Sequence, residues 1–131
     1  MPIKNMTPLL QVYDMKTSVA FYCDSLGFKV AHSYEPDGHF YWASLALGDI
    51  KLMLNACYED DKRPPEPDKN RINAHRDTEL YFECDNLDEV YNGLKNKGID
   101  IKPPAQSAYG AQEIKLKDPD GFQIIFFQET E

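Results

Sequence analysis

The chain has 131 residues, enough for one domain with a packed core, and 42% of them are hydrophobic. Its formal net charge of −8 argues against a nucleic-acid partner, because phosphates would be repelled. No stretch approaches the roughly 20 continuous apolar residues of a membrane span, and the start of the chain has no apolar signal-peptide core. We therefore expect a cytoplasmic protein with neither a membrane nor a nucleic acid as partner.

One sequence pattern occurs twice, and the second copy follows the first by 71 residues. An aspartate, a valine and a glycine with the same spacing stand at Asp14, Val19 and Gly27 and again at Asp85, Val90 and Gly98. Such a repeat predicts two copies of one supersecondary unit. The space between two such copies is a natural place for a ligand.

The first module, residues 1–57, is predicted to contain a strand, a helix and three more strands. Asp14 can cap the helix because its carboxylate accepts hydrogen bonds from amides of the first turn. Apolar residues three or four apart support the helix, and Gly27 ends it. The strands are predicted at residues 7–12, 28–34, 39–47 and 50–56.

Residues 58–77 interrupt this pattern. The segment is charged and rich in proline, so it can neither bury apolar area nor donate a regular hydrogen-bond ladder. It is therefore predicted to be a linker, or a flap over a functional site.

The second module, residues 78–131, repeats the order of the first. Asp85 is predicted to cap its helix and Gly98 to end it. Asp-Pro-Asp-Gly at residues 118–121 is typical of a turn, since proline suits its second position. The strands are predicted at residues 78–84, 99–101, 112–116 and 122–128.

The chain resembles the vicinal oxygen chelate superfamily, which includes glyoxalases, extradiol dioxygenases and bleomycin-resistance proteins. The resemblance is carried by residues 12–22 with Leu26-Gly27-Phe28, by Tyr109-Gly110 with Glu113, and by residues 117–122. It implies an α+β fold in which two βαβββ modules form a curved mixed sheet around a cavity. It also implies a homodimer, as in many members of the superfamily. Fold alone does not determine the reaction.

Metal-dependent members of this superfamily hold a divalent ion with His, Glu or Gln from the first and last strands of each module. The resemblance carries these four positions onto Thr7, Leu52, Glu79 and Ile125. Only Glu79 can bind a metal, whereas useful sites need about three protein ligands. We therefore expect no metal and no cofactor, which argues against metal-dependent glyoxalase or dioxygenase activity.

Strand alternation places a set of side chains on the expected cavity wall. Aromatic rings beside a carboxylate suit a planar or cationic molecule, through stacking and cation–π attraction. The alternation leaves open which of Tyr41 and Trp42 faces the ligand, and aromatic residues also fill cores and dimer interfaces. The predicted ligand-binding residues are Gln11, Tyr41, Trp42, Leu52, Glu79, Tyr81, Tyr109 and Ile125.

The residues predicted to line the cavity are compatible with two functions. The first is a metal-free small-molecule-binding protein similar to bleomycin-resistance proteins, which sequester a cationic drug without chemistry. The alternative is a metal-independent enzyme, an isomerase or a lyase-like catalyst of proton abstraction. Such an enzyme would use Glu79 as general base, with Tyr81 or Tyr109 as proton donor. A protein-interaction domain is the third hypothesis.

Overall fold

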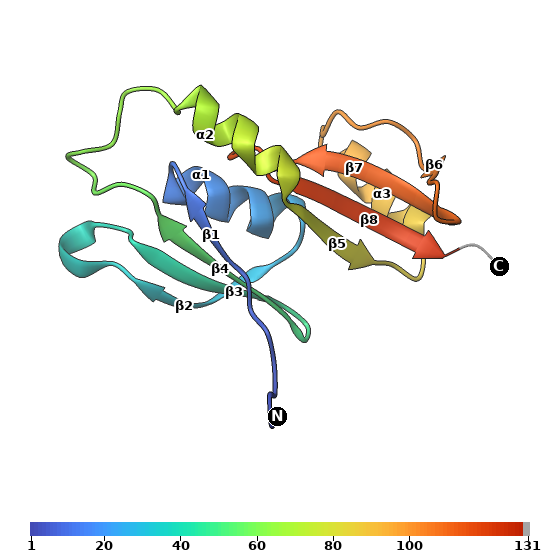
Figure 1. The fold of residues 1–131 in the computed structure, drawn as a ribbon, viewed down its shortest axis with the longest axis horizontal. Coiled ribbons are helices and arrows are strands. Elements are labelled where there is room, and N and C mark those ends of the chain that lie inside the picture. Colours follow the sequence, from blue (N-terminus) through green and yellow to red (C-terminus); the bar gives the residue numbers. More distant parts are fainter. Residues whose placement is uncertain (130–131) are drawn as a thin grey trace. The chain divides into compact units, whose positions relative to one another are not determined.

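The computed structural model describes residues 1–129, and the chain divides into two compact units at Pro67. Each unit is built on its own four-stranded sheet (Figure 1). No helix in the described part of the chain is both long enough and apolar enough to cross a bilayer.

Unit 1 has the strand order β1-β4-β3-β2, and β1 runs parallel to β4 while the other pairs are antiparallel. A π-helical turn over Phe21–Ser25 continues helix α1, and a 3-10 turn over Pro36–Gly38 follows β2. Its elements are β1 (Leu9–Val12), α1 (Met15–Ala20), β2 (Lys29–Tyr34), β3 (Trp42–Leu47) and β4 (Ile50–Ala56).

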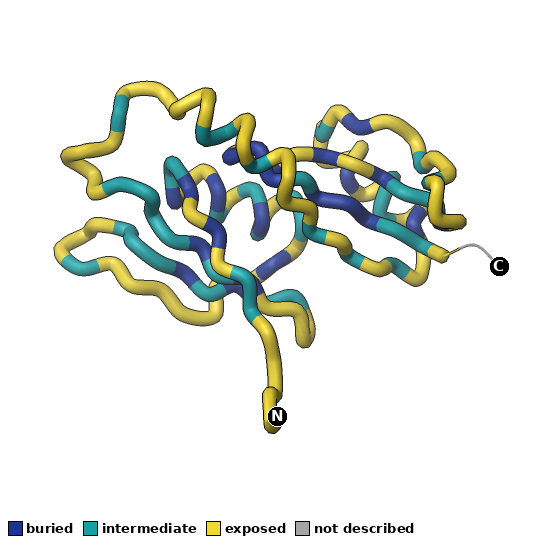
Figure 2. Tube along the Cα trace, in the orientation of Figure 1, coloured by how far each residue is buried: buried dark blue, intermediate teal, exposed yellow. Residues whose placement is uncertain are grey.

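The core of unit 1 lies between its sheet and α1, and the buried segments appear dark in Figure 2. Val12, Leu45 and Leu54 point from the sheet into this core and are fully buried, as is Tyr22 from the helical layer. Each buried leucine or valine contributes about 1.5–3 kcal/mol to stability. The helix begins as predicted, because the Asp14 carboxylate accepts from the backbone N–H groups of the first turn.

Unit 2 has the matching strand order β5-β8-β7-β6, with β5 parallel to β8. Its own core lies between the sheet and α3, which contributes the buried Leu87 and Leu94. Both units therefore contain the βαβββ order, and the predicted α+β fold class is confirmed. The elements are α2 (Lys69–Ala74), β5 (Glu79–Glu83), α3 (Leu87–Asn96), β6 (Ala105–Gln106), β7 (Ala111–Lys117) and β8 (Gln123–Glu129).

The cap of α3 differs from the prediction. Asn86, not Asp85, is the N-cap, and its side chain accepts from the backbone N–H of Glu89 at 3.1 Å. The Gln128 side chain fixes this register, since its Oε1 accepts from the N–H of Leu87 while its Nε2 donates to the carbonyl of Asp85. Asp85 therefore lies one residue before the cap.

The strand predicted at residues 99–101 does not form. Strand β6 starts only at Ala105, which stands opposite Glu113 of β7. Continuing this antiparallel register would place Pro103 opposite Lys115, and Pro103 has no N–H to donate. The ladder stops there, and Ile101 is buried outside any strand.

Helix α2 lies inside the segment predicted to be a linker or flap. Asp68 caps it by accepting from the N–H of Asn70 at 2.9 Å. A 3-10 turn over His75–Asp77 connects it to β5. The second half of the segment is thus helical and belongs to unit 2, whereas Tyr58–Pro67 belongs to unit 1.

Candidate functional site

One face of the sheet in unit 2 carries carboxylates and aromatic rings together. Alternation along β5 turns Glu79, Tyr81 and Glu83 to this face, while Leu80 and Phe82 are half-buried on the other. The parallel register sets Phe127 of β8 beside Glu83. We call Glu79, Tyr81, Glu83 and Phe127 the acidic sheet face.

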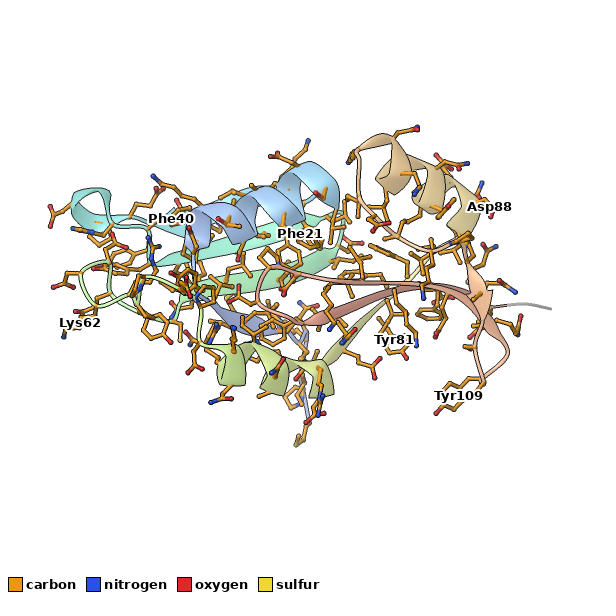
Figure 3. All side chains as sticks on the ribbon, turned by 90° about the horizontal axis from the view of Figure 1, so that it is seen from above. Phe21, Phe40, Lys62, Tyr81, Asp88 and Tyr109 are labelled. Atoms are coloured by element: carbon orange, nitrogen blue, oxygen red, sulfur yellow. The ribbon has the colours of Figure 1, made fainter. Side chains whose placement is uncertain are left out.

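Tyr81, which is labelled in Figure 3, has 50% of its surface exposed on the acidic sheet face. Its ring meets that of Phe127 edge-on, with centroids 5.7 Å apart. Partial burial raises the pKa of the Tyr81 phenol, and the negative charges of Glu79 and Glu113 raise it further. The phenol therefore stays neutral at physiological pH and can donate a hydrogen bond to a ligand.

Glu113 of β7 adjoins the acidic sheet face, and the sequence analysis did not select it as a site residue. Only 9% of its side chain is exposed, and its Oε1 lies 3.8 Å from the ammonium of Lys115. Alternation with the buried Ile114 and Leu116 was the signal that could have revealed its orientation. Glu113 also lines a hollow of about 700 Å³ beside the free part of β7.

Two other predicted residues of unit 2 have opposite environments. Ile125 pairs with Tyr81 and with Lys115 in the sheet, and its side chain is completely buried. Tyr109 is 90% exposed at the tip of the loop before β7, and Figure 3 shows it pointing away from the ribbon. Tyr109 is accessible to a ligand, while Ile125 forms the floor under its neighbours.

The open face of the sheet in unit 1 carries Gln11 and Trp42. Both stand beside Asn55 of β4 in the strand register, and the Asn55 amide donates to Gln11 Oε1 at 3.2 Å. Tyr41 precedes β3, and its ring stacks on that of His39 with a centroid separation of 6.0 Å. The structure therefore puts Trp42, rather than Tyr41, on the same face as Gln11.

Leu52 does not lie on that open face. It is 98% buried on the side of β4 that packs toward α1, opposite Leu45 of β3. Met53 takes the expected place, because it stands beside Leu9 in the parallel register with β1. A shift of one residue along a strand reverses the face that a side chain occupies.

Residues 6–126 match the family described as the Glyoxalase/Bleomycin resistance protein/Dioxygenase superfamily. The chain belongs to this superfamily. It is 28% identical over 130 residues to a bleomycin resistance protein of Geobacillus stearothermophilus, covering 93% of this chain and 94% of that protein. A relative with the same name and the same identity occurs in Staphylococcus aureus.

Two solved structures are also similar to this chain. One is a bleomycin resistance determinant encoded on the transposon Tn5, and the other is a bleomycin-binding protein complexed with bleomycin. In each case the identity is 26%, the TM-score is 0.73, and the match covers 98% of this chain and 100% of the other.

The metal-ligand positions of the superfamily do not fit a metal ion here. Leu52 and Ile125 are buried apolar side chains, and Thr7 offers only a hydroxyl. Glu79 is the one hard ligand among the four positions, and a single carboxylate holds an ion weakly. Among residues 1–129, no group of three or more His, Cys, Asp or Glu side chains is arranged to hold a metal.

The environment of Glu79 also bears on the enzymatic hypothesis. That hypothesis needs an apolar cavity around a general base, whereas Glu79 is exposed at the start of β5. Tyr81 is its neighbour on the same face and is a possible proton donor. Proton abstraction by Glu79 stays a hypothesis.

A second and smaller hollow, of about 180 Å³, lies in unit 1 beside the start of α1. The segment 58–64 is attached around it by several contacts. Tyr13 donates its hydroxyl to the carbonyl of Pro64 at 2.6 Å, and the Arg63 guanidinium lies 5.4 Å from the centre of the Tyr13 ring. His39 Nδ1 bonds to Asp60 at 2.5 Å, and this bond raises the pKa of His39.

Proposed function

We propose that this protein binds and sequesters a planar, cationic antibiotic of the bleomycin type without altering it chemically. The observation that carries the proposal is the acidic sheet face, on which the half-exposed Tyr81 lies close to the carboxylate of Glu79. The bleomycin resistance protein and the bleomycin-binding protein that resemble this chain support the choice of drug.

The physical basis is the match between this face and a cationic ring system. A cation over an aromatic face gains about 0.5–2 kcal/mol, and a neighbouring carboxylate adds Coulomb attraction. The net charge of −8 attracts cations from a distance and speeds their association. A stacked ring on Tyr81 or Tyr109 would supply apolar contact at the same time.

The open face of unit 1 is part of the same proposal. Gln11 offers an amide and Trp42 an aromatic ring, so this face presents its own stacking surface and hydrogen-bonding group to a planar ligand. A homodimer, as the resemblance implies, belongs to the proposal as well and is tested by light scattering.

Isothermal titration of metal-free bleomycin into the purified protein tests the proposal. We expect saturable binding with a dissociation constant in the micromolar range or tighter, and unchanged drug afterwards by mass spectrometry. Glu79→Gln and Tyr81→Ala should each weaken binding about tenfold, equivalent to about 1.4 kcal/mol. Glu66→Gln removes an exposed carboxylate of the other unit and serves as the matched control.

Trp42 fluorescence gives an independent readout during the same titration. A change of Trp42 emission that saturates with the calorimetric signal would mean that the open face of unit 1 takes part. No heat and no emission change up to about 1 mM drug would overturn the proposal. Chemical conversion of the drug would favour the enzymatic hypothesis instead.

A further inference from the structure

The hollow of about 700 Å³ in unit 2 lies beside backbone N–H and C=O groups of β7 that pair with no neighbouring strand. The carbonyl of Ala111 accepts from Ser107 on the β6 side of β7. Backbone direction alternates along an antiparallel strand, so the N–H and C=O of Lys115 also point to that side. Because Pro103 ends the ladder, no described strand pairs with Lys115 there.

The Glu113 side chain lines this hollow, and 9% of its surface is exposed. No buried side-chain oxygen in the described residues lacks a hydrogen-bond partner, so the Glu113 carboxylate oxygens are open to the hollow rather than sealed from it. Among residues 1–129, the cation within 4 Å of it is Lys115, whose side chain is 65% exposed and whose Nζ stands 3.8 Å away, beyond hydrogen-bond range. Glu113 therefore has capacity to accept a donor from a guest molecule.

The remaining wall sets the size and polarity of such a guest. Ile101, Pro103 and Ala105 give apolar contact, the exposed Lys102 adds a positive charge, and the exposed Asp100 adds a negative one. The hollow thus combines the Glu113 carboxylate as acceptor, an unpaired peptide group and the Lys102 cation. These features match, in turn, an ammonium group, an amide and a carboxylate.

We propose that this hollow is a binding site for a small amine-terminated, peptide-like molecule. In this site Glu113 accepts from the ammonium group, the backbone of Lys115 pairs with the amide, and Lys102 attracts the carboxylate. The proposal goes beyond antibiotic binding and does not depend on it, because the hollow lies at the free edge of β7 and Glu113, which stands opposite Phe127, is the one of these three residues that adjoins the acidic sheet face.

The test uses the full chain labelled with ¹⁵N and the dipeptide glycylglycine as the probe. Amide shifts of Ile101, Ser107 and Lys115 should change and saturate in the low millimolar range, which is typical of so small a ligand. N-acetylglycylglycine lacks the ammonium group and should shift these amides at least tenfold more weakly. Glycinamide lacks the carboxylate and should retain part of the effect.

Variants separate this site from the proposed antibiotic site. Glu113→Gln keeps the side-chain shape and should abolish saturation by glycylglycine, whereas Glu79→Gln should leave it unchanged. Equal shifts from glycylglycine and its acetylated form, or no saturation up to about 10 mM, would overturn the proposal even if bleomycin binds. The probe comparison in the unmodified protein keeps the test decisive if Glu113→Gln folds poorly.

Discussion

The guanidinium of Arg71 donates to the carboxylate of Asp120 at 2.8 Å, and only 15% and 1% of the two side chains are exposed. This pair fastens α2 to the turn between β7 and β8. His75 reinforces the attachment, since its ring stacks on Phe122 at 3.9 Å and its Nδ1 donates to the carbonyl of Asp120. The turn is rigid in itself because the Asp118 carboxylate accepts from two backbone amides.

Replacing Arg71 with alanine should destabilise the protein by about 2–3 kcal/mol, because the buried Asp120 carboxylate would lose its hydrogen bond to the Arg71 guanidinium. Urea unfolding monitored by circular dichroism measures the change. Lys69→Ala lies in the same helix on an exposed side chain and should change stability by less than about 0.5 kcal/mol. Equal effects of the two substitutions would show that the pair does not hold α2.

Gly121→Ala should destabilise the protein more than Gly110→Ala does. Both glycines have φ above +80°, so each substitution costs about 1–2 kcal/mol of backbone strain. A Cβ at position 121 would also stand 2.7 Å from the carbonyl oxygen of Ile72, whereas a Cβ at 110 meets nothing within 4 Å. The difference between the two melting temperatures isolates the contact with α2.

Asn86→Ala should lower the free energy of unfolding by about 1 kcal/mol, because the N–H of Glu89 would lose its acceptor. Asp85→Ala should have a smaller effect, since the Asp85 contact to Gln128 uses its backbone carbonyl. Chemical unfolding of both variants measures the two changes. A larger loss of unfolding free energy for Asp85→Ala than for Asn86→Ala would show that Asp85 caps the helix, as the sequence predicted.

The contact between His39 and Asp60 should weaken as pH rises. The hydrogen bond raises the pKa of His39 in the folded state, so its contribution is complete below the unfolded pKa of about 6.5. It is lost as pH rises through the higher folded value, when the imidazole becomes neutral. NMR titration of the His39 ring should show a lower pKa in Asp60→Asn, and an unchanged pKa would contradict the assignment.

Local signals predicted most of the fold. Strand β4 was placed correctly from end to end, because Gly48-Asp49 marks its start and alternation its length. The Asp14 cap and the alternation of β5 were also correct, since each depends on residues adjacent in sequence. The same alternation predicted that Tyr81 and Glu79 share a face.

The sequence-based predictions were wrong where contacts between residues far apart in the chain determine the structure. Helix α2 is short and charged, and it is held by Asp120, 49 residues from Arg71 in sequence. The Asn86 cap is fixed by Gln128, which is about as remote. Leu52 was misplaced because the facing of β4 follows its pairing with β1 and β3, and a carried-over position can miss that pairing by one residue.

Pro103 has a consequence for how this protein meets other chains. The missing donor is covalent, so no side-chain rearrangement can restore the ladder beside Lys115. A small molecule can reach this stretch of backbone. A full strand cannot pair along it, because Pro103 occupies the position opposite Lys115, and Lys115 and Lys117 place two charged side chains on this part of β7. The edge is therefore accessible to small molecules while being a poor template for aggregation or strand exchange.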